Sequence, residues 1–230
     1  MSHFVSKLTA GLLLAPALLA ASVAQAHQAG DIIVRAGAIV VDPREDSSGI
    51  KTGGANLGGK ATLDKDTQLG LNFAYMLTDQ FAVELLAATP FKHEVGVAGS
   101  PAGIDALNGK LGTIKHLPPT LSALWYPLQN NSAFQPYVGA GVNFTWFFDE
   151  EVGSEAKGKG FRGLSLDNSW GWAAQIGADY MLTENLMVNA QVRYIDISTT
   201  GYTHLDGVGR LKVDVDVDPF VYMVGLGYKF

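Results

Sequence analysis

The sequence predicts an all-β protein, an eight-stranded antiparallel transmembrane β-barrel, and two observations carry that prediction. Bulky apolar residues alternate with small or polar ones over eight separate segments, as they do in strands with one apolar face. The chain is 47% hydrophobic, yet no stretch after residue 26 holds the 18 or so consecutive apolar residues of a membrane helix. The final segment, residues 220–230, is about as long as a tilted membrane strand needs to be and ends on the aromatic Phe230.

Residues 1–26 predict a cleaved signal peptide, which leaves residues 27–230 as a single transmembrane barrel domain. Lys7 is the only Lys, Arg, Asp or Glu in this segment, an apolar run follows it, and Ala24-Gln25-Ala26 forms a small-x-small cleavage site. An N-terminal anchor helix is the alternative. It is disfavoured because the apolar run is shorter than the roughly 20 residues of a membrane span and contains Pro16.

Composition narrows the classes of function. The formal net charge is −6, and −7 once Lys7 leaves with the signal peptide, which disfavours a nucleic-acid partner. The absence of cysteine excludes a disulfide framework, a thiol nucleophile and a cysteine metal site. His93, His116 and His204 fall in or beside the predicted outer loops without metal-ligand spacing, so we expect solvated side chains there. These features predict a protein that is not an enzyme and that holds no cofactor or metal. The alternative for metal is a divalent cation bound by the acidic residues 149–151 or by Asp214, Asp216 and Asp218.

The eight predicted strands are joined by connections of two kinds. The connections after the second, fourth and sixth strands are short, whereas those after the first, third, fifth and seventh are long and polar. This asymmetry is typical of outer-membrane barrels and predicts short periplasmic turns, long extracellular loops and two periplasmic termini. A soluble β-sandwich or a lipocalin-like barrel would show the alternation without the asymmetry. The strands are predicted at 32–40, 69–77, 81–87, 117–126, 138–148, 169–182, 186–194 and 220–230.

The last predicted strand continues beyond the membrane. Asp214, Asp216 and Asp218 share their face with Phe220, and a regular strand would aim them at lipid, where each charge costs up to a few kcal/mol near the midplane. They are therefore expected above the bilayer, on a wall that extends past the outer surface, with Pro219 marking a bulge or an edge.

Several long motifs resemble the OmpW family of outer-membrane proteins, and the resemblance runs from His27 to Phe230. The motifs that carry it include Val83-Glu-Leu-Leu-Ala-Ala-Thr-Pro-Phe91, His116-Leu-Pro-Pro-Thr-Leu121, Gln135-Pro-Tyr-Val-Gly-Ala-Gly-Val-Asn143 and Val217-Asp-Pro-Phe220. The resemblance implies a hydrophobic funnel that opens outward and is closed part-way down. Small, mainly hydrophobic molecules would enter it passively and leave sideways through the wall into the membrane.

Such a lateral opening requires interrupted strand pairing, and Pro118 and Pro119 are the candidates. Neither can donate a ladder hydrogen bond, and tandem prolines do not occur in a fully paired central strand. The alternative is that these prolines only end the fourth strand at the membrane rim.

The family resemblance also implies a gate. Leu86 matches the family's gate leucine, but the facing position, a Trp in the family, is Arg193 here. We expect Arg193 to pair with Glu84, Asp179 or another lumen carboxylate. This departure keeps open a channel for small amino acids. A structural or surface-interaction barrel that binds lipopolysaccharide, host or phage partners is a third possibility.

The expected partners follow from the predicted location. They are outer-membrane lipid and lipopolysaccharide, small hydrophobic solutes, and the barrel assembly machinery. The last is expected because the terminal Phe230 resembles the signal which that machinery reads.

Overall fold

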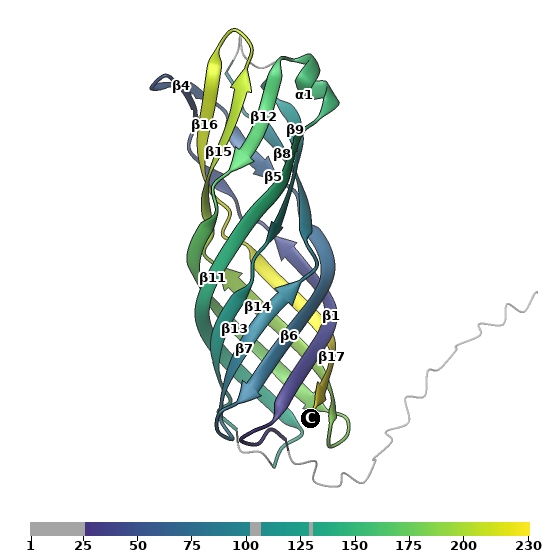
Figure 1. The fold of residues 1–230 in the computed structure, drawn as a ribbon. Helices are drawn as coiled ribbons and strands as arrows, with labels where there is room; N and C mark the ends of the chain where they lie inside the picture. The colour runs from purple at the N-terminus through teal and green to yellow at the C-terminus, as the bar shows by residue number, and fades with distance from the viewer. Residues whose placement is uncertain (1–25, 102–106, 129–130) are drawn as a thin grey trace, which may run out of the picture.

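Eight strands pair edge to edge around a closed barrel in the computed structural model, which describes residues 26–101, 107–128 and 131–230 (Figure 1). The order around the ring is β10-β7-β6-β1-β17-β14-β13-β11, and pairing of β10 with β11 closes it. All pairings are antiparallel, so the predicted fold class is confirmed. The predicted signal peptide lies outside the described residues, except for Ala26. The ring strands are β1 (Ile32–Asp42), β6 (Asp66–Met76), β7 (Phe81–Ala88), β10 (Thr120–Trp125), β11 (Phe134–Val152), β13 (Ser169–Met181), β14 (Leu186–Ile195) and β17 (Phe220–Lys229).

The alternation of the strands places apolar side chains outside and polar side chains inside. On β13, Ile176 is 62% exposed whereas its neighbour Gln175 is 4% exposed. The outer surface carries many large aromatic side chains, as the aromatic belts of membrane proteins do. Those exposed on the barrel strands include Phe81, Trp125, Phe134, Trp146, Trp170, Trp172, Tyr180 and Tyr228.

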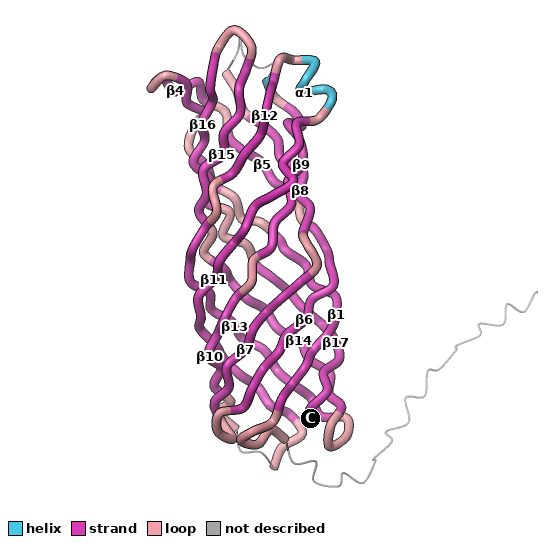
Figure 2. Tube along the Cα trace, in the orientation of Figure 1, coloured by secondary structure: helices cyan, strands magenta, loops and turns pink. Residues whose placement is uncertain are grey.

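The long connections contain strands that extend the barrel wall, as Figure 2 shows. One arc continues from the upper part of β11 through β9 and β8 to β5, and a second sheet has the order β12-β15-β16-β3-β4. These strands continue the wall beyond the eight-stranded ring, as the expected projection past the outer surface requires. The bounds are β2 (Asp46–Ser47), β3 (Ile50–Thr52), β4 (Ala55–Gly58), β5 (Lys60–Leu63), β8 (Phe91–Ala98), β9 (Gly109–Leu117), β12 (Phe161–Leu166), β15 (Ser198–Leu205) and β16 (Gly209–Asp216).

Two interruptions between consecutive strands separate the ring from this extension, and both lie at prolines of the sequence. Strand β16 ends at Asp216 and β17 begins at Phe220, with Asp218 at a φ of 38°, a left-handed conformation unusual outside glycine. The predicted fourth strand, 117–126, is split at Pro118 and Pro119 into β9 and β10. The single helix of the described residues, α1 (Ser154–Gly158), is too short to cross a membrane, and no described helix is long and apolar enough to do so.

The barrel interior is layered along its axis. We call the end with the short connections the turn end and the opposite end the extended end. An apolar cluster that includes Ile33, Met76 and Leu124 fills the turn end. A second apolar cluster, around Leu86 and Phe91, and a third, around Phe161 and Leu211, occupy the extended half. Between the first two clusters lies a layer of buried polar side chains, which we call the polar layer.

Candidate functional site: the barrel interior

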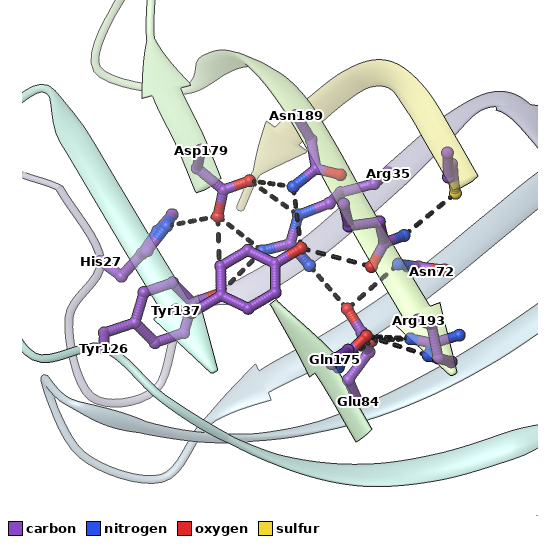
Figure 3. A network of polar contacts seen from close by, with 12 residues as sticks. His27, Arg35, Asn72, Glu84, Tyr126, Tyr137, Gln175, Asp179, Asn189 and Arg193 are labelled. Atoms are coloured by element: carbon purple, nitrogen blue, oxygen red, sulfur yellow. Dashed lines mark hydrogen bonds and ion pairs between the residues drawn. The ribbon is translucent and has the colours of Figure 1, made fainter. Parts of the chain in front are cut away.

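Four charged side chains meet in the polar layer, one from each of four strands (Figure 3). Arg35 donates through Nε and Nη2 to the two carboxylate oxygens of Asp179, at 2.9 and 2.6 Å, and through Nη1 to Glu84 Oε2 at 3.0 Å. Arg193 donates through Nη2 to Glu84 Oε1 at 2.7 Å. Each of the four is at most 2% exposed. Two cations and two anions thus neutralise one another across the lumen.

Neighbouring polar side chains satisfy the remaining bonding capacity of these ions. Gln175 and Asn72 donate to Glu84 at 3.0 and 3.1 Å. Asn189 donates to Asp179 at 2.8 Å, and His27 Nε2 lies 2.9 Å from the same carboxylate. Buried ions are tolerated only when they are paired and hydrogen-bonded, and this layer meets that condition.

The polar layer closes the barrel because its side chains span the lumen. An eight-stranded barrel has an interior just wide enough for side chains to fill. Tyr126 and Tyr137 lie on the turn-end side of the four ions, with ring centroids 5.2 Å apart, and Arg35 donates to the Tyr126 hydroxyl at 2.8 Å. The turn-end half therefore holds a packed plug.

The sequence predicts three of these four ions as lumen residues, namely Glu84, Asp179 and Arg193. The expected pairing of Arg193 with a lumen carboxylate is present. Arg35 and His27 were missed as members of the layer. The available signal was Arg35 itself, the one charged residue on the inward face of its strand.

The extended half encloses an apolar cavity of about 70 Å³. It lies among the extension strands, and its wall is made almost entirely of aliphatic and aromatic side chains. They include Ile50, Leu63, Val97, Leu111, Phe161 and Leu211. The cavity offers an apolar molecule a place out of water.

Leu86, the predicted gate residue, lies between these two regions. It is 2% exposed and belongs to the apolar cluster of the extended half, two residues after Glu84 on the inward face of β7. Leu86 therefore marks the level at which the interior changes from apolar to polar.

Close to this level, the barrel wall contains an interval without ladder pairing. The last β7–β10 pair is Leu86 with Thr120, and the next pair above it joins Phe91 of β8 to His116 of β9. Residues 87–90 and 117–119 lie between these two pairs. In this stretch the two segments form no ladder pairs with each other. We call this stretch the unpaired interval. The structure thus places Pro118 and Pro119 in the interval and adds Pro90, which the sequence prediction did not single out.

The outer edges of the interval are well held. Ala87 and Ala88 pair with Leu71 and Gly70 of β6. On the other side, the Pro119 carbonyl oxygen accepts a hydrogen bond from Phe144 N of β11 at 3.1 Å, and buried Asn143 Nδ2 donates to both the Pro118 and the Pro119 carbonyl oxygens at 3.1 Å. The wall is therefore interrupted locally while the rest of the ring stays paired.

The expectation that His93 and His116 are solvated is wrong. They are 1% and 5% exposed, and their Nε2 atoms lie 2.9 Å apart on the inward faces of β8 and β9. The outward face of the next pair carries Lys92 opposite Lys115, a level that lies beyond the apolar belt. Burial, and then the neighbouring His93, lower the pKa of His116 to about 3. Burial also lowers the pKa of His93. The extension strands bring these two loop residues together, and sequence spacing could not reveal that.

No described residues form a cluster of three or more His, Cys, Asp or Glu side chains that could hold a metal ion. His204, by contrast, is exposed on β15, as expected.

A closed eight-stranded wall with an apolar exterior and an interior filled by side chains around a polar layer defines a β-barrel membrane protein of the outer-membrane type. The family model "OmpW family" matches residues 28–230, and the chain belongs to this family of outer-membrane barrels.

Individual relatives agree with this assignment. The chain is 43% identical to outer membrane protein W of Escherichia coli strain K12 over 98% of this chain and 100% of that protein. It resembles the crystal structure of the outer membrane protein OprG from Pseudomonas aeruginosa, with a TM-score of 0.85 and 53% identity over 90% of this chain and 98% of that chain. A more distant relative, the dibenzothiophene metabolism operon protein PahQ of Pseudomonas aeruginosa, is 28% identical over 75% of this chain and 76% of that protein.

Proposed function

We propose that this barrel is a passive channel that takes up small, mainly hydrophobic molecules from outside and releases them sideways into the outer membrane. The observation that carries the proposal is the order of three features along one axis. An apolar cavity lies in the extended half, a sealed polar layer lies in the turn-end half, and the unpaired interval lies between them. A solute that enters the cavity meets buried ions below and an interrupted wall beside it, so the sideways route costs the least desolvation.

The physical benefit of such a route is that it bypasses the polar surface of the membrane. Lipopolysaccharide presents a charged and hydrated layer that excludes apolar molecules. Release directly into hydrocarbon keeps apolar surface out of water and needs no aqueous exit. The name of the relative PahQ supports this class of cargo, since dibenzothiophene is a fused aromatic molecule with no hydrogen-bond donor.

The proposed orientation puts the turn end and both chain termini in the periplasm and the extension strands outside the cell. Phe230 is 69% exposed beside the first strand, and its N–H donates to Ile32 O at 2.9 Å. This position suits recognition of the terminal residue by the barrel assembly machinery. Lipopolysaccharide would surround the upper part of the belt.

A channel for small amino acids is the second candidate, and the charges of the polar layer favour it. A zwitterion carries one ammonium and one carboxylate group, which could exchange partners with Glu84 and Arg193. Such a solute would pass through the polar layer, whereas an apolar solute would avoid it. A barrel whose role is structural or surface-binding would transport neither.

The two neighbouring prolines provide the test. The Pro119 carbonyl accepts a hydrogen bond from Phe144 N of β11, and we expect the Pro118 nitrogen, one residue earlier, to border the unpaired interval. Pro118→Ala restores an N–H there, and a new hydrogen bond worth about 0.5–1.5 kcal/mol would reduce opening roughly two- to tenfold. Pro119→Ala is the matched control, because its new N–H faces the paired side.

Uptake of an apolar dye and of glycine would be measured in proteoliposomes with both variants and the unaltered protein. We expect Pro118→Ala to slow dye entry with no loss of heat resistance, and Pro119→Ala to leave it nearly unchanged. Dye entry at the unaltered rate in a folded Pro118→Ala barrel would remove the lateral route. Glycine uptake without dye uptake would favour the amino-acid channel. Uptake of neither solute would favour the structural role.

A further inference from the structure

The buried histidine pair stands directly at the border of the unpaired interval. His116 belongs to the first β8–β9 pair above the interval, opposite Phe91, and His93 lies on the same inward face two residues later on β8. The contact between the two imidazoles therefore joins the two strands where the ladder resumes.

The contacts of the pair define which nitrogens carry protons. His93 Nδ1 lies 2.6 Å from the backbone oxygen of Asp64, so this nitrogen is the donor and His93 Nε2 is left as an acceptor. His116 Nε2, at 2.9 Å, must then donate to it. His116 Nδ1 is buried and has no hydrogen-bond partner. The contact thus requires that His93 Nε2 carry no proton, or that it donate to a deprotonated His116 Nε2.

The surroundings of the histidine pair can stabilise one added proton at most. His116 stacks between Phe91 and Phe147, with ring centroids at 5.4 and 5.7 Å, and no carboxylate oxygen contacts either of its nitrogens. Asp64 Oδ1 lies 3.7 Å from His93 Nδ1, and the Asp66 carboxylate adds a weaker favourable field, so His93 can accept a single proton.

The other charged groups nearby are directed elsewhere. Lys92 and Glu94 of β8 and Lys115 of β9 lie on the outward faces of their strands, where Lys115 pairs with Asp149 of β11 at 2.9 Å and Lys110 pairs with Glu94. The Asp66 carboxylate itself accepts from Lys92 N at 2.8 Å. None of these groups can stabilise a second imidazolium, because a doubly protonated pair would place two N–H groups and two positive charges against each other at 2.9 Å.

We propose that the His93–His116 contact is an acid-sensitive latch on the unpaired interval, which holds β8 against β9 while the pair carries at most one added proton and separates when both imidazoles are protonated. Separation lengthens the unpaired interval by the adjacent ladder pair, Phe91 with His116. If the proposed lateral route operates, acid therefore increases the release of apolar solutes into the membrane. Histidines in an opened, hydrated interval regain ordinary affinity for protons. Each pH unit below about 6.5 then favours the opened form by up to about tenfold per histidine.

Spin labels can report the latch directly because the chain has no cysteine of its own. Lys92→Cys and Lys115→Cys place two labels on outward-facing cross-strand partners next to the latch. Dipolar broadening of their EPR spectra would be compared at about pH 7.5 and about pH 5, together with uptake of an apolar dye. The comparison would be made in the double-cysteine protein alone and with His116→Phe, His93→Phe or His204→Gln added.

With both histidines present, we expect strong broadening near neutral pH and its loss in acid, with dye uptake raised about tenfold or more. His116→Phe keeps the aromatic stack and should make both readouts independent of pH, as should His93→Phe. His204→Gln removes an exposed histidine of the extension and should leave both responses intact. If the Phe variants do not fold, imidazole ¹⁵N resonances of the unaltered chain provide the same test, because both histidines must titrate over the pH range in which broadening is lost.

The outcomes separate the latch from the proposed function. Broadening that does not change with pH, or a pH response that survives in His116→Phe, would overturn the latch whether or not dye enters. A pH-dependent spectrum without dye uptake at any pH would support the latch and contradict lateral transport. A pH-dependent spectrum with pH-independent uptake would overturn the coupling of the latch to release.

Discussion

The two halves of this barrel share one continuous wall, yet they fill their interiors with opposite chemistry. The turn-end half is closed by four paired ions and their hydrogen-bonding partners, whereas the extended half is lined by aliphatic and aromatic side chains around a cavity. Ion pairs are directional and leave little freedom to the groups that they hold, while apolar contacts can be remade around a guest. The comparison teaches that a narrow barrel can be filled by paired ions at one level and hold an apolar cavity at another without any change in strand number.

The largest effect should come from removing the shared anion of the polar layer. Glu84→Ala leaves Arg193 without its ion pair and Arg35 with one carboxylate instead of two. An unpaired buried charge costs about 3–5 kcal/mol of unfolding free energy. Urea unfolding of the variant and the unaltered protein in lipid vesicles would measure this loss of unfolding free energy.

The matched control is Glu94→Ala on β8, which removes the half-exposed partner of Lys110. Its cost should stay below about 1 kcal/mol. Equal losses in the two variants would mean that the polar layer is hydrated and does not seal the barrel.

A smaller effect is expected when polarity is introduced into the apolar half. Leu211→Asn replaces an apolar side chain of the cavity wall with an amide that must give up water, and should cost about 1–3 kcal/mol of unfolding free energy. Binding of an apolar fluorescent probe should weaken as well. Leu211→Met preserves volume and apolarity, so its cost should be under about 1.5 kcal/mol and probe binding should be retained. Unchanged probe binding in Leu211→Asn would place the probe elsewhere.

The halves should also differ in their response to acid. The pKa of His116 is lowered in the folded protein to about 3 from an ordinary value near 6.5, so the unfolded state binds more protons between these values. Stability of the extended half should therefore fall as pH drops below about 6.5, by up to about 1.4 kcal/mol per pH unit.

Hydrogen exchange of β8 and β9 amides as a function of pH would measure this loss. The His116→Phe variant should show a flatter pH profile, because it has no proton to bind at this position. An identical profile in the variant would assign the acid sensitivity to other groups.

The smallest effect is expected at the surface of the extension. Arg162 and Asp206 form an ion pair at 2.9 Å in which both side chains are more than half exposed. Arg162→Ala should change the unfolding free energy by less than about 1 kcal/mol, and the difference should shrink in high salt. A loss comparable to that of Glu84→Ala would contradict the distinction between buried and exposed pairs.

Much of the fold could be predicted because the period of a strand is two. Alternation puts Ile176 on the opposite face of its strand from Gln175, and it puts Glu84 and Arg193 on the faces that the structure turns inward. Connection lengths then separated a membrane barrel from a soluble sandwich. Pro219 marked the break before the last strand, and the tandem prolines marked the split of the fourth.

The candidate site was predicted less completely, and the omissions have a common cause. The sequence indicates which face a side chain occupies but not its height along the barrel axis. Arg35 meets Asp179 across 144 positions of chain only because strand tilt and stagger bring their levels together. The cavity likewise required the extension strands, which the sequence showed only as long polar connections.

The sequence by itself therefore determined the class of fold, the inside and outside of each ring strand, the family, and the residue types available to fill the lumen. Only the tertiary structure decided that His93 and His116 touch, that Pro90 joins Pro118 and Pro119 at one interval, and that four ions close a single layer. The physical reason is that the face of a strand on which a side chain lies is a local property of two successive peptide units. Contact across a barrel depends on the register of all eight strands at once, which no single segment of sequence contains.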